Sequence, residues 1–242
     1  MTKSEIINNY INLFAKFFDI TADNYKTLKY LNLKGERDLD RILDCKFLLQ
    51  DTQLAKENIK KFGLCGRVVD YDDGELYLRV YGFFNACYIQ KEVIETLDNL
   101  LGLVFDKKIN NENIFKFRAY FASHGSNIKD SKEKIRKSFL LSRPDLRKNI
   151  ISGYSSNDLQ NIHFIKKEKV ENLMSLWDDL LEKELQKILK KIIIDKNIEL
   201  LDKSLISLKR DLQKFIKLSK NKNIINIIEI SKEQTLTIKT IL

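Results

Sequence analysis

Apolar residues recur at three- and four-residue steps along most of the chain, which is the spacing of amphipathic α-helices. The pattern predicts helices over about 4–20, 36–62, 75–105 and 111–124, with a short helix ending at Leu31 between the first two. Gly63 and Gly125 follow two of these runs, in the position where a helix commonly ends in the left-handed conformation. We therefore expect the first half of the chain to be helical.

The pattern changes between about 137 and 165, where short apolar runs alternate with turn residues. These runs predict short strands or irregular structure around the turn at Pro144. Helical spacing returns over about 166–193 and 197–219 with only a short break, which indicates an antiparallel helical hairpin. The last twenty residues are compatible with a strand or with a helix.

Together these elements predict a mainly α protein in three parts. An N-terminal helical segment covers 1–35, a helical core with a strand-containing insertion at about 137–165 covers 36–192, and a C-terminal helical extension covers 193–242. The chain of 242 residues has one Pro and eight Gly, which excludes Pro-rich and loop-dominated architectures.

Composition narrows the class of protein. With 43% hydrophobic and 32% charged residues, and no apolar run near the length of a membrane span, we expect a soluble, cytoplasmic protein without membrane contact. Three widely spaced cysteines form no metal-binding or disulfide pattern, so no metal or other cofactor is expected. The net charge of +9 favours an anionic partner. That indication is weak, because a chain this rich in Lys, Ile and Asn can owe its basic balance to an AT-rich genome.

Charge is unevenly distributed along the chain. Residues 69–106 hold eight acidic and two basic residues, a net charge of −6, whereas residues 126–150 hold eight basic and three acidic residues, a net charge of +5. A basic stretch of this kind favours a phosphate-bearing substrate. A solvated loop is the alternative. In the basic stretch, Lys134, Arg136 and Lys137 are candidate substrate contacts.

The chain has two histidines, His124 and His163, and no phosphate-binding glycine loop, zinc-protease motif or serine-hydrolase motif. Histidine is the first candidate for a general base near neutral pH. His163 lies in a strand-like apolar run, which favours a structural role. His124 stands six residues after Arg118, at the end of a predicted helix.

The spacing Arg118-x5-His124, in a short helix that follows a long one, resembles the motif of the HEPN superfamily. The resemblance covers roughly residues 36–190, and its specific part spans about fifty of them. It implies a HEPN-like helical bundle and a metal-independent endoribonuclease, typically of toxin–antitoxin or phage-defence systems, whose homodimer brings two motifs together. An antitoxin or other protein partner is then possible. The sequence departs from the family at Ala119, where members often have a polar residue.

The resemblance assigns chemical roles. RNA cleavage without a metal needs a base for the ribose 2′-hydroxyl and a cation that stabilises charge on the phosphate. His124 would be the acid/base and Arg118 the phosphate clamp. Two residues six positions apart on an ideal helix point in directions about 120° apart around its axis. The two side chains therefore converge only if the helix loosens near its end or a partner subunit completes the site. Alternatively, Arg118 caps carbonyl groups or pairs with an acid of 69–106, and His124 is an ordinary helix-end residue that bonds carbonyl groups of its own helix.

A polar and aromatic stripe on the predicted 75–105 helix adds further candidates. Tyr77, Tyr81, Asn85 and Tyr88 share one face, where they either contact bases or pack against a neighbouring helix. Asn85 is a candidate to support the Arg118/His124 pair. Tyr81, Ser126 and Asn127 join the candidate substrate contacts. The alternative function is a non-catalytic helical protein that recruits nucleic acid or a protein partner.

Overall fold

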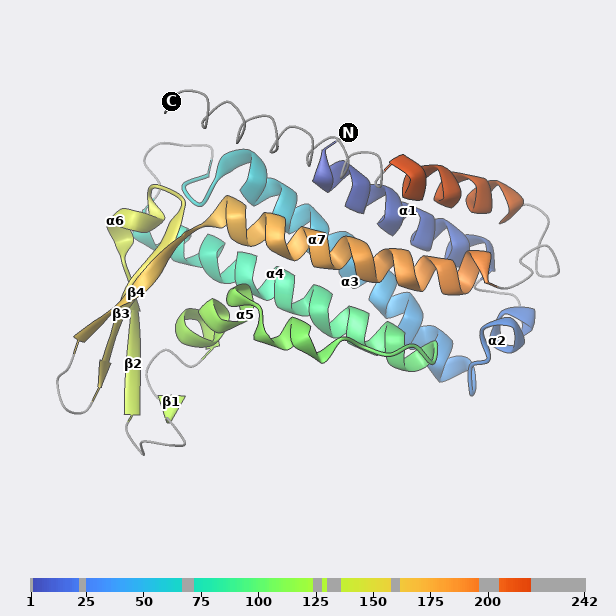
Figure 1. Ribbon diagram of the computed structural model, residues 1–242, viewed down its shortest axis with the longest axis horizontal. Helices are drawn as coiled ribbons and strands as arrows, with labels where there is room; N and C mark the ends of the chain where they lie inside the picture. The colour runs from blue at the N-terminus through green and yellow to red at the C-terminus, as the bar shows by residue number, and fades with distance from the viewer. Residues whose placement is uncertain are drawn as a thin grey trace, which may run out of the picture.

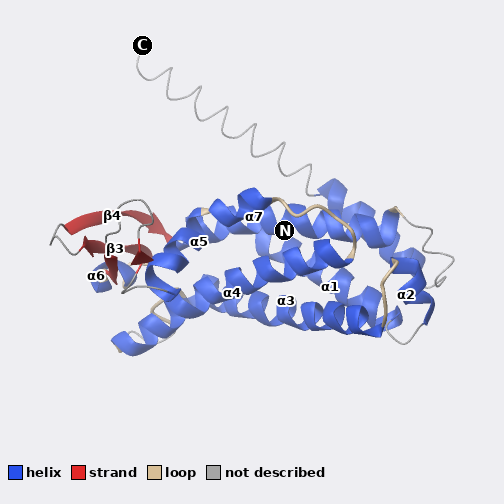
Figure 2. Cartoon of the chain, turned by 90° about the horizontal axis from the view of Figure 1, so that it is seen from below, coloured by secondary structure: helices blue, strands red, loops and turns tan. Residues whose placement is uncertain are grey.

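The computed structural model describes residues 2–21, 25–66, 72–123, 128–129, 136–157, 162–195 and 205–218. Within these residues the protein is mostly helical and has one small antiparallel sheet, as the sequence predicts. Long helices lie side by side in an elongated bundle, and the sheet lies at one end of it (Figures 1 and 2).

The elements follow the chain in a simple order. The long helices are α1 (Lys3–Thr21), α3 (Glu36–Phe62), α4 (Asp73–Leu100) and α7 (Val170–Leu189). The short helical elements are α2 (Tyr25–Leu31), the 3-10 turn η1 (Lys107–Asn111), α5 (Asn113–Arg118), α6 (Arg143–Leu146), and the π-helical turns η2 (Ala119–Ser123) and η3 (Lys190–Ile194). The strands are β1 (Ile128–Lys129), β2 (Arg136–Leu141), β3 (Ile150–Asn157) and β4 (Ile162–Lys169). A further helix covers 206–218.

The predicted helix over 36–62 is confirmed as α3, and Gly63 ends it with a φ of 65°. The predicted helix over 75–105 is α4, which begins at a cap where the Asp72 carboxylate accepts the Glu75 N–H at 2.9 Å. Its predicted end at 105 is wrong. The helix stops at Leu100 because Gly102 adopts a φ of 65° and the Leu103 N–H turns back to the Asp98 carbonyl at 2.7 Å.

Two other predicted boundaries also differ. The single helix expected over 111–124 is interrupted, because η1 ends at Asn111 and the hydrogen bonding widens from α to π after Arg118. The helix expected from 166 begins only at Val170. β4 continues to Lys169, which pairs with Ile150 of β3, so the strand-containing part extends beyond the predicted 137–165.

The C-terminal helix over 206–218 runs antiparallel to α7 and lies beside α1 (Figure 1). Its Phe215 ring meets the Tyr10 ring of α1 edge to face, with centroids 6.5 Å apart. The expected hairpin therefore has both of its helices, and its connecting residues lie outside the described part of the chain. The last twenty residues, whose sequence pattern is compatible with a strand or with a helix, also lie outside the described part. Within the described residues, no helix is both long and apolar enough to cross a membrane.

The sheet has the strand order β1-β2-β3-β4, and all pairs are antiparallel. One face packs on the bundle: the Phe139 ring of β2 stacks on the Tyr120 ring of η2, with centroids 4.5 Å apart and planes 5° apart. Gly153 of β3 is required on the same side. A side chain there would come within 2.8 Å of the Phe121 ring and 2.1 Å of the Leu140 carbonyl oxygen.

A buried polar cluster crosses the middle of the apolar core. Lys56 of α3 is 1% exposed and forms an ion pair with Asp178 of α7. Gln90 of α4 accepts hydrogen bonds from Lys56 at 3.1 Å and from the Trp177 indole at 2.8 Å, through the same oxygen. Gln90 in turn donates to Gln53 at 3.3 Å. The cluster therefore joins three of the long helices by polar contacts as well as by apolar packing.

The cysteines behave as small apolar residues. Cys45 and Cys87 are buried, and burial raises the pKa of their thiols to about 11 and about 12. Cys65 is partly exposed, and its Sγ lies 3.4 Å from the Arg147 carbonyl oxygen. At neutral pH the two buried thiols are therefore protonated and poorly nucleophilic.

We expect Lys56→Met to lower the free energy of unfolding by about 3–5 kcal/mol, because it leaves the Asp178 carboxylate buried without its cation. Lys56→Met combined with Asp178→Leu should recover most of that loss, since both charges are then absent. Urea denaturation measures both. Lys46→Met, which breaks a pair with the exposed Asp19, is the control and should cost less than about 1 kcal/mol. Equal losses in the single and double variants would contradict the assignment.

Asp98 predicts a pH dependence. Burial raises the pKa of its carboxyl to about 6, although Lys187 donates to Oδ2 at 2.6 Å. A carboxyl whose pKa is raised on folding favours the folded state when protonated, so its contribution is complete below about pH 4 and is lost as the pH rises through 6. Relative to Asp98→Asn, the wild-type free energy of unfolding should fall by about 2–3 kcal/mol between pH 4 and pH 7. Parallel pH profiles in urea denaturation would refute this.

Candidate functional site

Arg118, the last residue of α5, lies against the outer face of α4 with its side chain partly buried. Its Nε donates to Oδ1 of Asn85 at 3.2 Å. Its Cζ stands 3.7 Å from the centroid of the Tyr88 ring. The hydrogen bond fixes one edge of the guanidinium group, and the contact with the Tyr88 ring fixes one of its faces. Together the two contacts define the orientation of the group.

We call Asn85 and Tyr88, which hold the guanidinium group of Arg118, the cradle. The sequence of α4 explains why they lie together. Asn85 and Tyr88 are three residues apart on one helix and therefore share a face. The Tyr88 ring is held by an edge contact with Phe115, at 6.4 Å between centroids, and Phe115 makes a similar contact with Trp177 at 5.2 Å. A chain of rings thus connects the guanidinium group of Arg118 to the buried polar cluster.

An acidic group stands beside the cradle. The pKa of Glu92 is lowered mainly by its hydrogen bond with Lys91, and further by a hydrogen bond from Tyr88 and by the positive charge of Arg118. An acid of the 69–106 segment, Glu92, is therefore close enough to interact with the charge of Arg118. The Nε–H of Arg118 donates to the neutral amide of Asn85.

The backbone changes immediately after Arg118. Residues Ala119–Ser123 form the π-helical turn η2, and turns of this kind are frequent at functional sites. The chain between Arg118 and His124 is therefore not a regular α-helix. His124 itself, with Ser126, Asn127 and Lys134, lies outside the described residues, so their convergence with Arg118 stays a prediction.

The remaining predicted contacts lie on two elements. Tyr81 is 36% exposed on the same face of α4, and its ring centroid is 6.0 Å from that of Tyr77. Arg136 and Lys137 lie in β2, where Lys137 pairs with Asn157 of β3 and Ile128 of β1. The structure therefore brings Asn85 to Arg118 and places Tyr81 one turn away on α4, while the two basic residues belong to the sheet. His163 is exposed in β4, opposite Ser155.

Sequence reasoning missed a second arginine at the aromatic face of α4. Arg143, at the start of α6, donates to the Tyr77 hydroxyl at 3.2 Å and to Asp73 at 3.3 Å. Arg147 also binds Asp73, at 2.9 Å. The opposite net charges of 69–106 and 126–150 were the available indication that these segments meet. The stripe from Tyr77 to Tyr88 therefore carries an arginine near each end.

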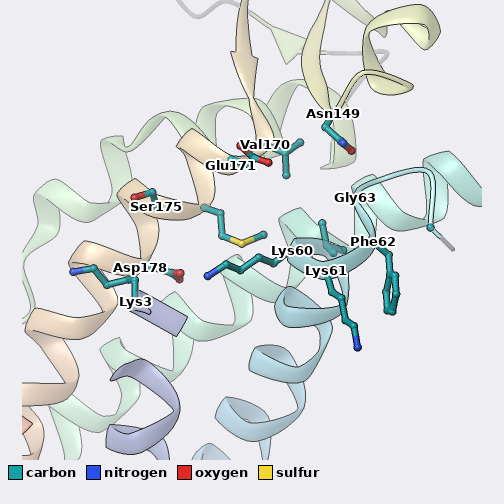
Figure 3. Close-up of a pocket in the computed structure, with 13 residues that line it drawn as sticks. Lys3, Lys60, Lys61, Phe62, Gly63, Asn149, Val170, Glu171, Ser175 and Asp178 are labelled. Atoms are coloured by element: carbon teal, nitrogen blue, oxygen red, sulfur yellow. The ribbon is translucent and has the colours of Figure 1, made fainter. Parts of the chain in front are cut away.

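A cavity of about 560 Å³, also missed from sequence, lies between α3, α7 and the loop after α6 (Figure 3). Its wall combines apolar side chains such as Val170 and Met174 with polar groups of Lys60, Asn149 and Asp178. In Figure 3 the Lys60 amine points along the cavity toward Asp178, whereas Lys61 points away. The volume suits a small molecule, but its lining shares no residue with the Arg118 cradle.

Within the described residues, no group of three or more His, Cys, Asp or Glu side chains is arranged to hold a metal ion. Comparison with protein-family models, with curated proteins and with solved structures gave no match. The interpretation of the site therefore depends on its own geometry and on the Arg118-x5-His124 motif.

A double-mutant cycle tests the cradle without reference to function. Asn85→Ala and Arg118→Ala should show a coupling free energy of about 0.5–1.5 kcal/mol in urea denaturation, since each change removes the same hydrogen bond. The control pairs Arg118→Ala with Asn99→Ala, where Asn99 is an exposed residue near the C-terminal end of α4. This pair should show no coupling free energy. Additive effects in both cycles would mean that the hydrogen bond contributes nothing.

Proposed function

We propose that the protein is a metal-independent endoribonuclease of HEPN type, in which Arg118 binds the scissile phosphate and His124 transfers protons. The observation that carries the proposal is the fixed guanidinium group of Arg118, held by Asn85 and Tyr88 at the end of α5. The support is chemical: a metal-free ribonuclease needs a cation whose position is set before the phosphate arrives.

The cradle suits this role because of how guanidinium groups bind. Stacking on Tyr88 uses a face of the group, whereas a phosphate binds to its N–H edge, so the two interactions are compatible. Asn85 orients the group through a neutral acceptor, the oxygen of its side-chain amide. The developing charge on a phosphorane would therefore meet a preoriented cation.

The remaining roles follow from the same proposal. His124 would accept the 2′-hydroxyl proton or protonate the leaving oxygen, since histidine titrates near neutral pH. Tyr81 stands one turn from Asn85, where its ring would contact a base of the bound strand. A homodimer would place two such motifs across one cleft, and a toxin or phage-defence effector would have an antitoxin or other protein as partner.

The test is cleavage of total cellular RNA in EDTA by the wild type, Arg118→Ala and His124→Ala. We expect the wild type to leave cyclic phosphate ends, and each variant to lose about 100-fold or more in rate while its melting temperature changes little. Arg118→Lys should stay strongly impaired, because an ammonium group lacks the planar fork.

Arg37→Ala is the matched control, because Arg37 is an exposed arginine in the first turn of α3. It should cleave like the wild type. Equal cleavage by wild type and His124→Ala would remove the proposed mechanism. Absence of cleavage by every form, tested with and without cell extract, would favour the non-catalytic binding protein instead.

A further inference from the structure

The outward face of the sheet carries an exposed apolar row. Leu140 of β2 lies opposite Tyr154 of β3, which lies opposite Phe164 of β4, so the three side chains cross the sheet in line. They are 68%, 45% and 52% exposed. Ile162, two residues before Phe164 and on the same face, is 71% exposed. An antiparallel sheet with one packed face normally presents polar side chains on the other, so this row is a departure that indicates a binding surface.

The two aromatic rings of the row, which we call the platform, are in contact but are not coplanar. Tyr154 and Phe164 are in edge contact, with centroids 5.5 Å apart and planes 74° apart. Ser138 and Ser156 occupy the next row of the same face, as the alternation of the strands requires. Rings flanked by hydroxyl groups offer stacking surfaces and hydrogen bonds together, which is the combination that unpaired bases need.

The segment that contains the platform strands is basic in sequence. Residues 126–169 contain eleven Lys and Arg against five Asp and Glu, a net charge of +6 in a chain whose total is +9. Lys167, which pairs with Asp145 at 3.0 Å, has its Nζ 5.7 Å from the Phe164 ring centroid. A polyanion with aromatic faces is complementary to such a surface, and single-stranded nucleic acid is the polymer that has both.

We infer that the Leu140–Tyr154–Phe164 face of the sheet binds single-stranded RNA by stacking unpaired bases on Tyr154 and Phe164. The choice of RNA over DNA rests on the proposed ribonuclease function, whereas the binding of a single strand does not. The opposite face of the same strand β2 packs on η2, directly after Arg118, through the Phe139–Tyr120 stack. A strand held on this platform is therefore bound by an element that is anchored beside the proposed catalytic arginine.

The test measures RNA affinity in the full-length chain carrying Arg118→Ala, with EDTA present, so that the probe is not cut. Fluorescence anisotropy would follow a labelled, unstructured RNA of about 16 nucleotides. Adding Tyr154→Leu and Phe164→Leu should weaken binding about tenfold to hundredfold, because leucine keeps apolar contact but has no ring to stack on. The slope of affinity against salt should not change, since the basic residues remain.

Phe47→Leu is the matched control. Phe47 is 57% exposed on α3 and, like Phe164, has a lysine over its ring, with the Lys46 Nζ 4.4 Å from the centroid. It should leave RNA affinity unchanged. All three substituted side chains are exposed, and a thermal melt of each variant checks that the fold is retained.

The outcomes separate the two proposals. Unchanged affinity in the Tyr154→Leu/Phe164→Leu variant overturns the platform, as does equal competition by duplex RNA, whose bases cannot stack on protein rings. Dissociation of a dimer by the double variant without loss of RNA affinity would show that the face joins two copies, and would also overturn it. If wild-type protein cuts no RNA but the double variant still loses affinity, the platform stands and the ribonuclease proposal fails.

Discussion

The ammonium group of Lys56 is almost fully removed from solvent, and its counterion is the carboxylate of Asp178 on another helix. A buried charge that loses its partner costs several kcal/mol, so α3 and α7 can pack only in the register that joins these two groups. Gln90 accepts from Lys56 and from the indole of Trp177, which brings α4 into the same arrangement. Because Gln90 faces inward, the rotation of α4 is fixed, and with it the outward direction of the face that holds Arg118.

The sheet is attached to this frame at two places. β4 passes directly into α7 at Val170, whose N–H bonds to the carbonyl of Asn149 at 3.0 Å, so the direction of the strand is coupled to that of the helix. The second attachment is the stack of Phe139 on Tyr120, which joins β2 to the π-helical turn after Arg118. A displacement of the sheet would therefore shift the turn that follows Arg118.

The local spacing of residues was sufficient to predict the helices whose apolar stripe faces the core. It also singled out Asn85 on the exposed stripe of α4. It failed where the deciding partner is distant in sequence. Lys56, Gln90 and Asp178 look like surface residues until their mutual contacts are known, and the extension of β4 to Lys169 depends on pairing with β3. Likewise the motif predicted a role for Arg118, but its orientation depends on Asn85, 33 residues earlier.

The distribution of charge connects the two proposals. Asp73, at the start of the acidic α4, binds both Arg143 and Arg147, so part of the positive charge of 126–150 is used to dock the sheet on the bundle. The rest belongs, in sequence, to the strands that carry the exposed row of rings and to their connections. Stacking depends weakly on salt, whereas attraction between a basic surface and phosphate depends strongly on it. An RNA strand would thus be attracted by charge, held by Tyr154 and Phe164, and presented to a guanidinium group whose direction the core has already set.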